Sequence, residues 1–354
     1  STEAQAFFNQ GIGQLHGFWY LEAERSFRQV LKLHPEHPMA YWGIAMANAK
    51  NRARSQSIIK KAVAGRSKVG NREQMWIDSM NAYQNETDSK KRKAARLKSY
   101  QNISDKYPED LEAQAFLALA MYNNVRGKKN YDEVEKRISK ILAKSPKHPC
   151  HHYRIHLWDY KDPKRAVVSV GQCGQAAPGI AHMWHMPGHI LSRLKRYNDA
   201  TWQQEASARV DHAHMMRDRV MPDRIHNFAH NNEWLTRNLS QAGKVNRALD
   251  MAKNMIELPR LPNVKEDGSW SFPSRSSHYY GRKHLYDLLT NYELWADVIK
   301  LKDTHYFKSD KTASTRAKYW RILACAYVNT GNGPKAKALL GQMEKLLIEQ
   351  RASK

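Results

Sequence analysis

Apolar and small side chains recur along the chain with the spacing of paired helices. In the first repeat, Phe7, Gly11, Ala23, Phe27 and Pro35 follow one another as in a helix-turn-helix unit of about 34 residues. Small residues let two helices approach closely, and large residues fill the space between one pair and the next. The pattern therefore predicts a succession of packed helix pairs.

A stripe of apolar residues that ends at a proline returns three more times. It is formed by Tyr100, Ile103 and Pro108, by Val134, Ile138, Ile141 and Pro146, and by Ala166, Val170, Cys173 and Pro178. Later repeats carry matching positions at Trp184, Gly188 and Ala200, at Gly243, Ala248, Ala252 and Met255, and at Trp320, Ala324, Tyr327, Gly331, Ala336 and Leu340. The pattern resembles the tetratricopeptide repeat (TPR). This resemblance implies an all-α fold, a right-handed α-solenoid of TPR-like helix-turn-helix repeats.

The repeats extend over most of the chain. We therefore expect a single TPR-like superhelical domain over residues 1–354, with about seven to eight helical pairs. Irregular insertions are expected near residues 51–71, 211–223 and 258–277, where the period is lost. The last of these is rich in proline and is predicted to be a long loop. No run of the sequence approaches the roughly 18 apolar residues of a membrane span.

Histidine gives the strongest chemical signal, because the 17 histidines of the chain are unevenly spread. In the segment GIAHMWHMPGHILSR, residues 179–193, a helix would place His182, His185, His189 and Arg193 within an arc of about 80°. Trp184 falls on another face. The segment thus predicts a helix with one face for packing and one for chemistry.

Two further segments repeat this arrangement. His152 and His156 are four residues apart, as are His226 and His230, and the second pair continues into Glu233 and Arg237 on one stripe. First helices of TPR-like repeats line the concave surface, so three neighbouring helices present imidazoles to one groove. The predicted metal ligands are His152, His156, His182, His185, His189, His226 and His230. His148 and His151 are expected at the surface or in a supporting position.

Imidazole-rich ligation without a required carboxylate suits copper, zinc or iron better than magnesium or calcium. Copper is our first choice, followed by zinc or iron. The sequence has no glycine-rich phosphate loop, GxSxG elbow or HExxH segment, so no nucleotide cofactor is expected. Chance placement of histidines on helix faces is the alternative explanation of any single pair. Three such pairs favour a real site.

Two of the histidine segments resemble a bacterial branch of TPR proteins that carries HYxIHxxD and HxxHMPxHIxxRLxxY. The matching positions are His152, Tyr153, Ile155, His156 and Asp159, then His182, His185, Met186, Pro187, His189, Arg193, Leu194 and Tyr197. The resemblance supports the histidines as one set. It names no reaction.

The chain is strongly basic, with 58 Lys and Arg against 34 Asp and Glu and a formal net charge of +24. Such a charge attracts anions, so an acidic small molecule, peptide or glycan is the expected partner. The predicted substrate- or anion-binding residues are Arg193, Arg237, Glu233 and Trp184. Nucleic acid is supported by no motif. The basic residues are scattered, so their charge could also serve only to keep the protein solvated.

Three interpretations compete. The first is a metalloprotein with a His-rich site in its concave groove, acting as an oxidoreductase or hydrolase on an anionic substrate. The second is a metal-free TPR scaffold for an acidic peptide, protein or polyanionic glycan. The third is a haem or electron-transfer protein with paired histidine ligands, although no CxxCH is present. A soluble protein is expected, either cytosolic or a processed chain of the periplasm or the secreted fraction.

Overall fold

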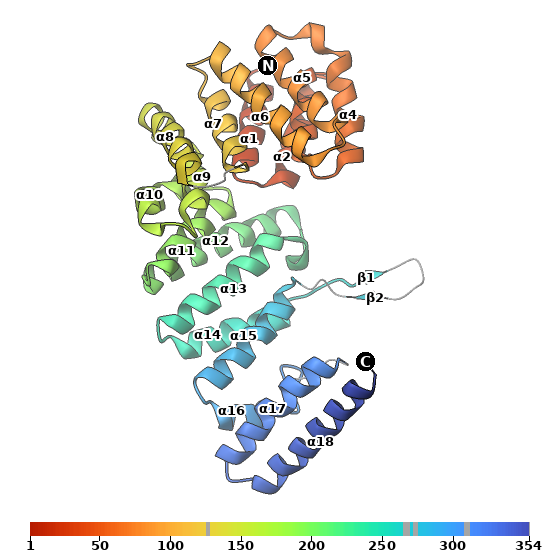
Figure 1. Cartoon of the computed structure of the whole chain (residues 1–354), viewed down its shortest axis with the longest axis vertical. Helices are drawn as coiled ribbons and strands as arrows, with labels where there is room; N and C mark the ends of the chain where they lie inside the picture. Colours follow the sequence, from red (N-terminus) through yellow and green to blue (C-terminus); the bar gives the residue numbers. More distant parts are fainter. Residues whose placement is uncertain (125–127, 265–269, 272–274, 308–311, 354) are drawn as a thin grey trace. The chain divides into compact units, whose positions relative to one another are not determined.

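The computed structural model describes residues 1–124, 128–264, 270–271, 275–307 and 312–353. Within them the chain is almost entirely helical, and consecutive helices lie side by side in pairs (Figure 1). The prediction of an all-α array of TPR-like helix pairs is confirmed. The chain divides into two compact units, Ser1–Arg196 and Tyr197–Lys354. The single domain over residues 1–354 stays a prediction.

The described part of unit 1 contains five helix pairs followed by one further helix. Its helices are α1 (Thr2–His16), α2 (Tyr20–Leu33), α3 (Pro38–Ala47), α4 (Arg52–Ala64), α5 (Asn71–Asn85), α6 (Ser89–Lys106), α7 (Leu111–Tyr122), α8 (Lys128–Lys144), α9 (Cys150–Trp158), α10 (Val167–Ala176) and α11 (Ala181–Arg193). Short 3-10 turns η1 (Arg66–Lys68) and η2 (Pro163–Ala166) precede α5 and α10.

The packing of the first pairs explains the recurrence of small and large residues. Phe27 of α2 is fully buried. A Cβ atom added at Gly11 of α1 would come within 2.7 Å of the Phe27 ring, and one added at Gly43 of α3 within 2.6 Å. Glycine is therefore needed at both positions to admit the ring between the helices.

The prolines of the repeated stripe lie just beyond helix ends. Pro35, Pro108, Pro146 and Pro178 each stand two residues after the last residue of α2, α6, α8 and α10. Proline has no backbone N–H to donate and disfavours a helical conformation at the residue before it. Each proline thus stops one helix and allows the chain to turn back into the next.

Unit 2 continues the helical pattern around one irregular segment. Its elements are α12 (Tyr197–Asp218), η3 (Pro222–Arg224), α13 (His226–Gln241), α14 (Val245–Glu257), β1 (Asn263–Val264), β2 (Trp270–Ser271), α15 (Ser277–Asn291), α16 (Trp295–Leu301), α17 (Ala313–Asn329) and α18 (Gly333–Ala352). The two short strands pair antiparallel, Val264 opposite Trp270. They lie in the segment 258–277, where a loop is expected.

Two of the expected insertions are more regular than the sequence suggested. The segment near 51–71 is largely helical: it forms α4, which buries Ser55, Ile59 and Ala62 on one face and packs on α3 and α5. Near 211–223, α12 continues as far as Asp218. The helix period was missed because most side chains of these segments are polar or charged.

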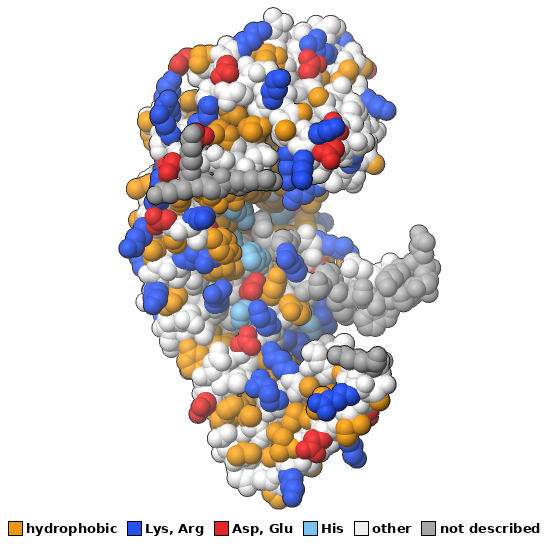
Figure 2. Space-filling view, viewed as in Figure 1, with side chains coloured by type: hydrophobic (Ala, Val, Ile, Leu, Met, Phe, Trp, Pro, Cys, Tyr) orange, Lys and Arg blue, Asp and Glu red, His pale blue; other side chains and the backbone are white. Residues whose placement is uncertain are grey.

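Lys and Arg side chains are spread over the face of the protein shown in Figure 2, among acidic and apolar ones. This distribution gives no single basic patch on that face. Among the described residues, no helix is both long and apolar enough to cross a membrane.

Candidate metal centre

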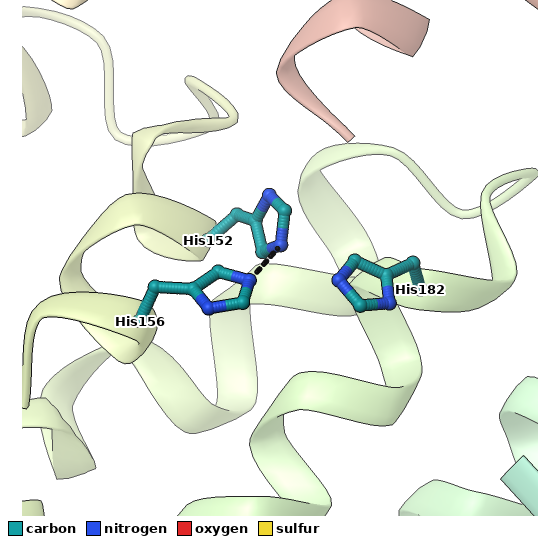
Figure 3. A group of neighbouring side chains, drawn as sticks. All are labelled: His152, His156 and His182. Carbon is teal, nitrogen blue, oxygen red and sulfur yellow. Dashed lines mark hydrogen bonds between the residues drawn. The ribbon is translucent and has the colours of Figure 1, made fainter. Parts of the chain in front are cut away.

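Two helices of unit 1 carry the first two histidine groups. α9 follows directly after Pro149, whose fixed φ suits a helix start, and it places His152 and His156 one turn apart. α11 carries His182 in its first turn. Figure 3 shows the three rings turned toward one another, two from α9 and one from α11. The structure thus brings the predicted pair His152 and His156 together with His182 of the next histidine group.

The three rings are close enough to share an ion. Nε2 of His152 and Nε2 of His156 lie 2.9 Å apart. The ring centroid of His182 lies 4.9 Å from that of His152, and one ring nitrogen of each residue lies within 4.8 Å of the other two. Two nitrogens bound to one ion at about 2.0–2.1 Å are separated by at most about 4.2 Å. A small ring rotation therefore suffices to reach ligand distances.

The hydrogen bond made by Nδ1 of His152 shows which of its two ring nitrogens carries the hydrogen. Nδ1 of His152 lies 2.7 Å from the carbonyl oxygen of His16, and a carbonyl only accepts, so Nδ1 carries the hydrogen. Burial first, and then the neighbouring His156, hold the pKa of His152 well below its usual range. The ring is therefore neutral and Nε2 keeps its lone pair, which is the tautomer that binds a metal through Nε2.

A second pair lies one turn further along α11. Nε2 of His185 and Nε2 of His189 are 2.8 Å apart, and both side chains are buried. The ring of His182 stacks with that of His185, with 5.7 Å between centroids. The five imidazoles of α9 and α11 thus form a continuous row within unit 1.

Asp159, the residue after α9, binds two side chains of α11. Its Oδ2 accepts a hydrogen bond from Nδ1 of His189 at 3.1 Å, and its Oδ1 accepts one from Nε of Arg193 at 2.6 Å. Burial opposes ionisation, but these two partners hold the pKa of Asp159 below its usual range. Arg193 also lies 3.9 Å over the ring of Tyr160. The predicted anion-binding Arg193 is thus already paired with a carboxylate.

The third histidine group lies in unit 2, on α13. Nδ1 of His230 is 3.2 Å from Oε2 of Glu233, and Nε2 of His284, on α15, is 3.7 Å from Oε1. Burial acts against the charged carboxylate, yet the hydrogen bond with His230 and the nearby ring of His284 lower the pKa of Glu233 to about 2. Of the predicted residues, His230 and Glu233 are therefore neighbours. His284 was not recognised as a candidate from the sequence.

The remaining residues of that stripe are not part of this contact. Arg237 is exposed and lies 4.9 Å over the ring of Trp234. The side chain of His226 lies outside the described part of the structure. Its role as a ligand stays a prediction.

Trp184 occupies a packing position. A Cβ atom added at Gly174 of α10 would come within 2.3 Å of the Trp184 ring, and the indole N–H donates to the carbonyl oxygen of Pro178 at 3.0 Å. These contacts join α10 to α11. They match the packing face expected for Trp184 and do not place it with the imidazoles.

One buried cluster of unit 1 was missed by sequence reasoning. Nε2 of His16 lies 2.6 Å from Oε2 of Glu112, and Nε2 of His148 lies 3.5 Å from Oε1. The backbone N–H of Cys150 donates to Nδ1 of His148 at 3.1 Å, so the hydrogen of the neutral ring is on Nε2. That nitrogen has no lone pair for a metal. The cluster is therefore a hydrogen-bonded support for a carboxylate.

The surface position considered for His148 and His151 is wrong. Both side chains are buried. His151 bonds Oγ of Ser169 at 2.9 Å and the carbonyl oxygen of Pro146 at 2.8 Å. They support the ends of α9 and α10 and do not converge with His152.

No protein-family model matches the chain, and no curated protein matches it in sequence. The C-terminal part of a TPR repeat-containing protein from Cytophaga hutchinsonii is 13% identical with a TM-score of 0.40, over 71% of this chain and 95% of that chain. An IFIT1 monomeric mutant with Gppp-AAAA is 15% identical with a TM-score of 0.44, over 92% of this chain and 77% of that chain. A Rap protein complexed with competence and sporulation factor is 12% identical with a TM-score of 0.42, over the whole of both chains.

These likenesses concern the fold alone. The helix pairs, the interleaved glycine and aromatic positions and the proline stops define the class: an all-α repeat protein of TPR-like helix pairs. Such arrays generally serve as binding scaffolds. The described part of this chain adds buried histidine clusters to its helix pairs.

Proposed function

We propose that the chain is a TPR-like metalloprotein that holds a transition-metal ion among His152, His156 and His182. The observation that carries the proposal is the convergence of three ring nitrogens from two helices. Zinc, copper and iron accept such a ligand set, whereas magnesium and calcium require oxygen ligands. Copper is the first choice because divalent copper binds nitrogen sites most strongly in the first-row series.

The hydrogen bonds around the rings support this function. Because Nε2 of His152 has a lone pair and no hydrogen, the hydrogen between the two Nε2 atoms belongs to His156 when no ion is bound. An ion replaces that hydrogen, and His156 then carries its hydrogen on Nδ1. The carbonyl oxygen of His16 keeps His152 oriented throughout, as supporting groups do in metal sites.

The proposed ligand set leaves one coordination position of the ion free for a substrate. Three protein ligands leave a further coordination position, as in catalytic rather than structural zinc sites. An ion with an open position acts as a Lewis acid or exchanges electrons, so oxidoreductase or hydrolase activity on an anionic substrate belongs to the proposal. His156 and His182 are partly exposed, and a substrate would approach on their side.

Metal analysis of protein purified without a polyhistidine tag tests the proposal. We expect about one or more equivalents of copper, zinc or iron per chain, and a loss of at least tenfold in affinity in His182→Ala, whose side chain is not fully buried. His212→Ala is the matched control, because His212 is an exposed histidine of α12. Retention of helicity by circular dichroism separates lost binding from lost fold. Equal metal affinity in the His182 and His212 variants would refute the site.

A second candidate function is the binding of a peptide or protein, which a cavity of about 470 Å³ in unit 1 favours. Side chains of alternate helices line it, among them Phe8 of α1, Trp42 of α3 and Phe116 of α7. Glu112 also lines the cavity, and Arg72 is bound to Asp110. The cavity therefore gives no preference for the acidic partner expected from the net charge.

A fluorescence-anisotropy screen of acidic and basic peptides tests this second function. Binding in the cavity should weaken in Phe8→Ala, since Phe8 is the partly exposed aromatic residue of the lining. An acidic peptide attracted by the net charge of +24 rather than by the cavity should bind more weakly as ionic strength rises. Peptides that bind the variant and the unchanged protein equally would remove the cavity from consideration.

A further inference from the structure

The imidazoles of α9 and α11 form two pairs rather than one cluster. In each pair, two Nε2 atoms face each other, at 2.9 Å in one and 2.8 Å in the other. His185 and His189 stand outside the group of three nitrogens that lie within 4.8 Å of one another around His152. A single ion cannot bind both pairs, because its nitrogen ligands must lie within about 4.2 Å of one another.

Each pair also has its own supporting bond. His152 is held through Nδ1 by the carbonyl oxygen of His16, and His189 is held through Nδ1 by the carboxylate of Asp159. Such bonds to the far nitrogen are typical of imidazoles that bind metals through Nε2. The two pairs are thus independently oriented, with His182 between them at 4.9 Å from His152 and 5.7 Å from His185, centroid to centroid.

We propose that this row binds two copper ions side by side and that the reduced pair takes up dioxygen. The inference rests on the proposed metal function, specifies its stoichiometry and adds dioxygen as the electron acceptor. The first ion is bound by His152, His156 and His182, and the second by His185 and His189 with further ligands. Neutral imidazoles add no negative charge, so they suit copper in its monovalent as well as its divalent state.

If both ions start as copper(I), they supply the two electrons themselves, and this step needs no external reductant. Each copper(I) ion gives one electron and becomes copper(II), and dioxygen accepts the two electrons and becomes peroxide. One ion alone would supply only one electron, so the adjacent second pair is what makes the two-electron step available. His152 and His185 are fully buried, while the partly exposed His156 and His182 leave an entry for a small diatomic molecule.

Anaerobic titration of the full chain with copper(I), followed by exposure to air, tests the inference. We expect about two copper ions per chain, uptake of about one dioxygen per copper pair, and a weak copper(II) electron paramagnetic resonance signal because the two spins couple. His185→Ala should retain about one copper ion and show a full signal after oxidation. His212→Ala should behave as the unchanged protein does.

The possible results distinguish a failure of the proposed metal function from a failure of the copper pair. No bound copper, zinc or iron would overturn both of them. A single copper ion with a full resonance signal in the unchanged protein would leave the metal function standing and overturn the copper pair. Because His185 is fully buried, His185→Gln serves as a second variant that keeps a polar side chain there. Two uncoupled copper ions without dioxygen uptake would also overturn the inference.

Discussion

Asp159 accepts a hydrogen bond through Oδ2 from Nδ1 of His189 at 3.1 Å, across 30 positions of the chain. The same carboxylate holds Arg193 through Oδ1. The contact joins the last residue of the HYxIHxxD segment to the second half of the HxxHMPxHIxxRL segment. A carboxylate on the far nitrogen of an imidazole fixes its tautomer and raises its basicity. The two segments therefore act as one unit.

Removal of the Asp159 charge should weaken metal binding. In Asp159→Asn, we expect the second ion, bound by His185 and His189, to be held about 10–100-fold more weakly, the usual effect of changing a residue that supports a ligand. Competition with a chromophoric chelator measures it. Asp132→Asn is the control, since Asp132 pairs with the exposed Arg165 in the same unit. Equal affinity in the two variants would mean that His189 needs no carboxylate.

His16→Ala should leave metal content unchanged and lower stability. Only the backbone carbonyl of His16 contacts His152, whereas its ring binds Glu112 at 2.6 Å. Removing the ring leaves that carboxylate with one partner fewer, so the free energy of unfolding should fall by about 1–3 kcal/mol. Elemental analysis and urea denaturation check the two parts. Loss of metal from a folded His16→Ala protein would show that the His16 ring itself takes part in binding.

Gly174→Ala should destabilise the protein, because the new Cβ atom would come within 2.3 Å of the Trp184 ring. Overpacking of this kind costs about 1–3 kcal/mol. Gly171→Ala on the same helix is a matched control, since a Cβ atom there meets no atom within 4 Å. The control should be neutral or stabilised by about 0.5–1 kcal/mol through helix propensity. Thermal denaturation of both variants measures the difference in stability. Equal melting temperatures would contradict the packing role of Trp184.

The sequence predicted those features that depend on near neighbours in the chain. The i,i+4 spacing of His152 and His156 fixes their positions on one face of any helix. Likewise, a glycine opposite an aromatic residue and a proline at a helix end act through local geometry, so the helix pairs could be recognised. α4 was missed because its only buried side chains are Ser55, Ile59 and Ala62.

The supporting contacts could not be predicted, because they join distant parts of the chain. The carbonyl of His16 meets His152 across 136 positions, and Glu112 meets His16 across 96. No periodicity connects such residues, and a backbone carbonyl has no sequence signature at all. Asp159 was recognised as a motif position, but its role depends on how α9 faces α11.

Asp211 gives a prediction for the pH dependence of unit 2. It is buried on α12, and its Oδ2 accepts a hydrogen bond from Nδ2 of Asn231 at 2.7 Å. Burial outweighs this bond and raises the pKa of Asp211 to about 8, while in an unfolded chain an aspartate has a pKa of about 4. Between these two values the folded state holds a proton that the unfolded state has released. The free energy of unfolding contributed by Asp211 therefore falls as pH rises from about 4 to about 8.

Asp211→Asn removes this dependence, because an amide does not ionise and can still accept the hydrogen bond from Asn231. The melting temperature of the variant should exceed that of the unchanged protein by several degrees at pH 8, and the difference should shrink toward pH 5, since each unit of pKa difference corresponds to about 1.4 kcal/mol. Melting curves of both proteins over this range measure the effect. Parallel curves would show that Asp211 is already ionised in the folded protein, and a charged carboxylate at this depth would then require a cationic partner close to α12.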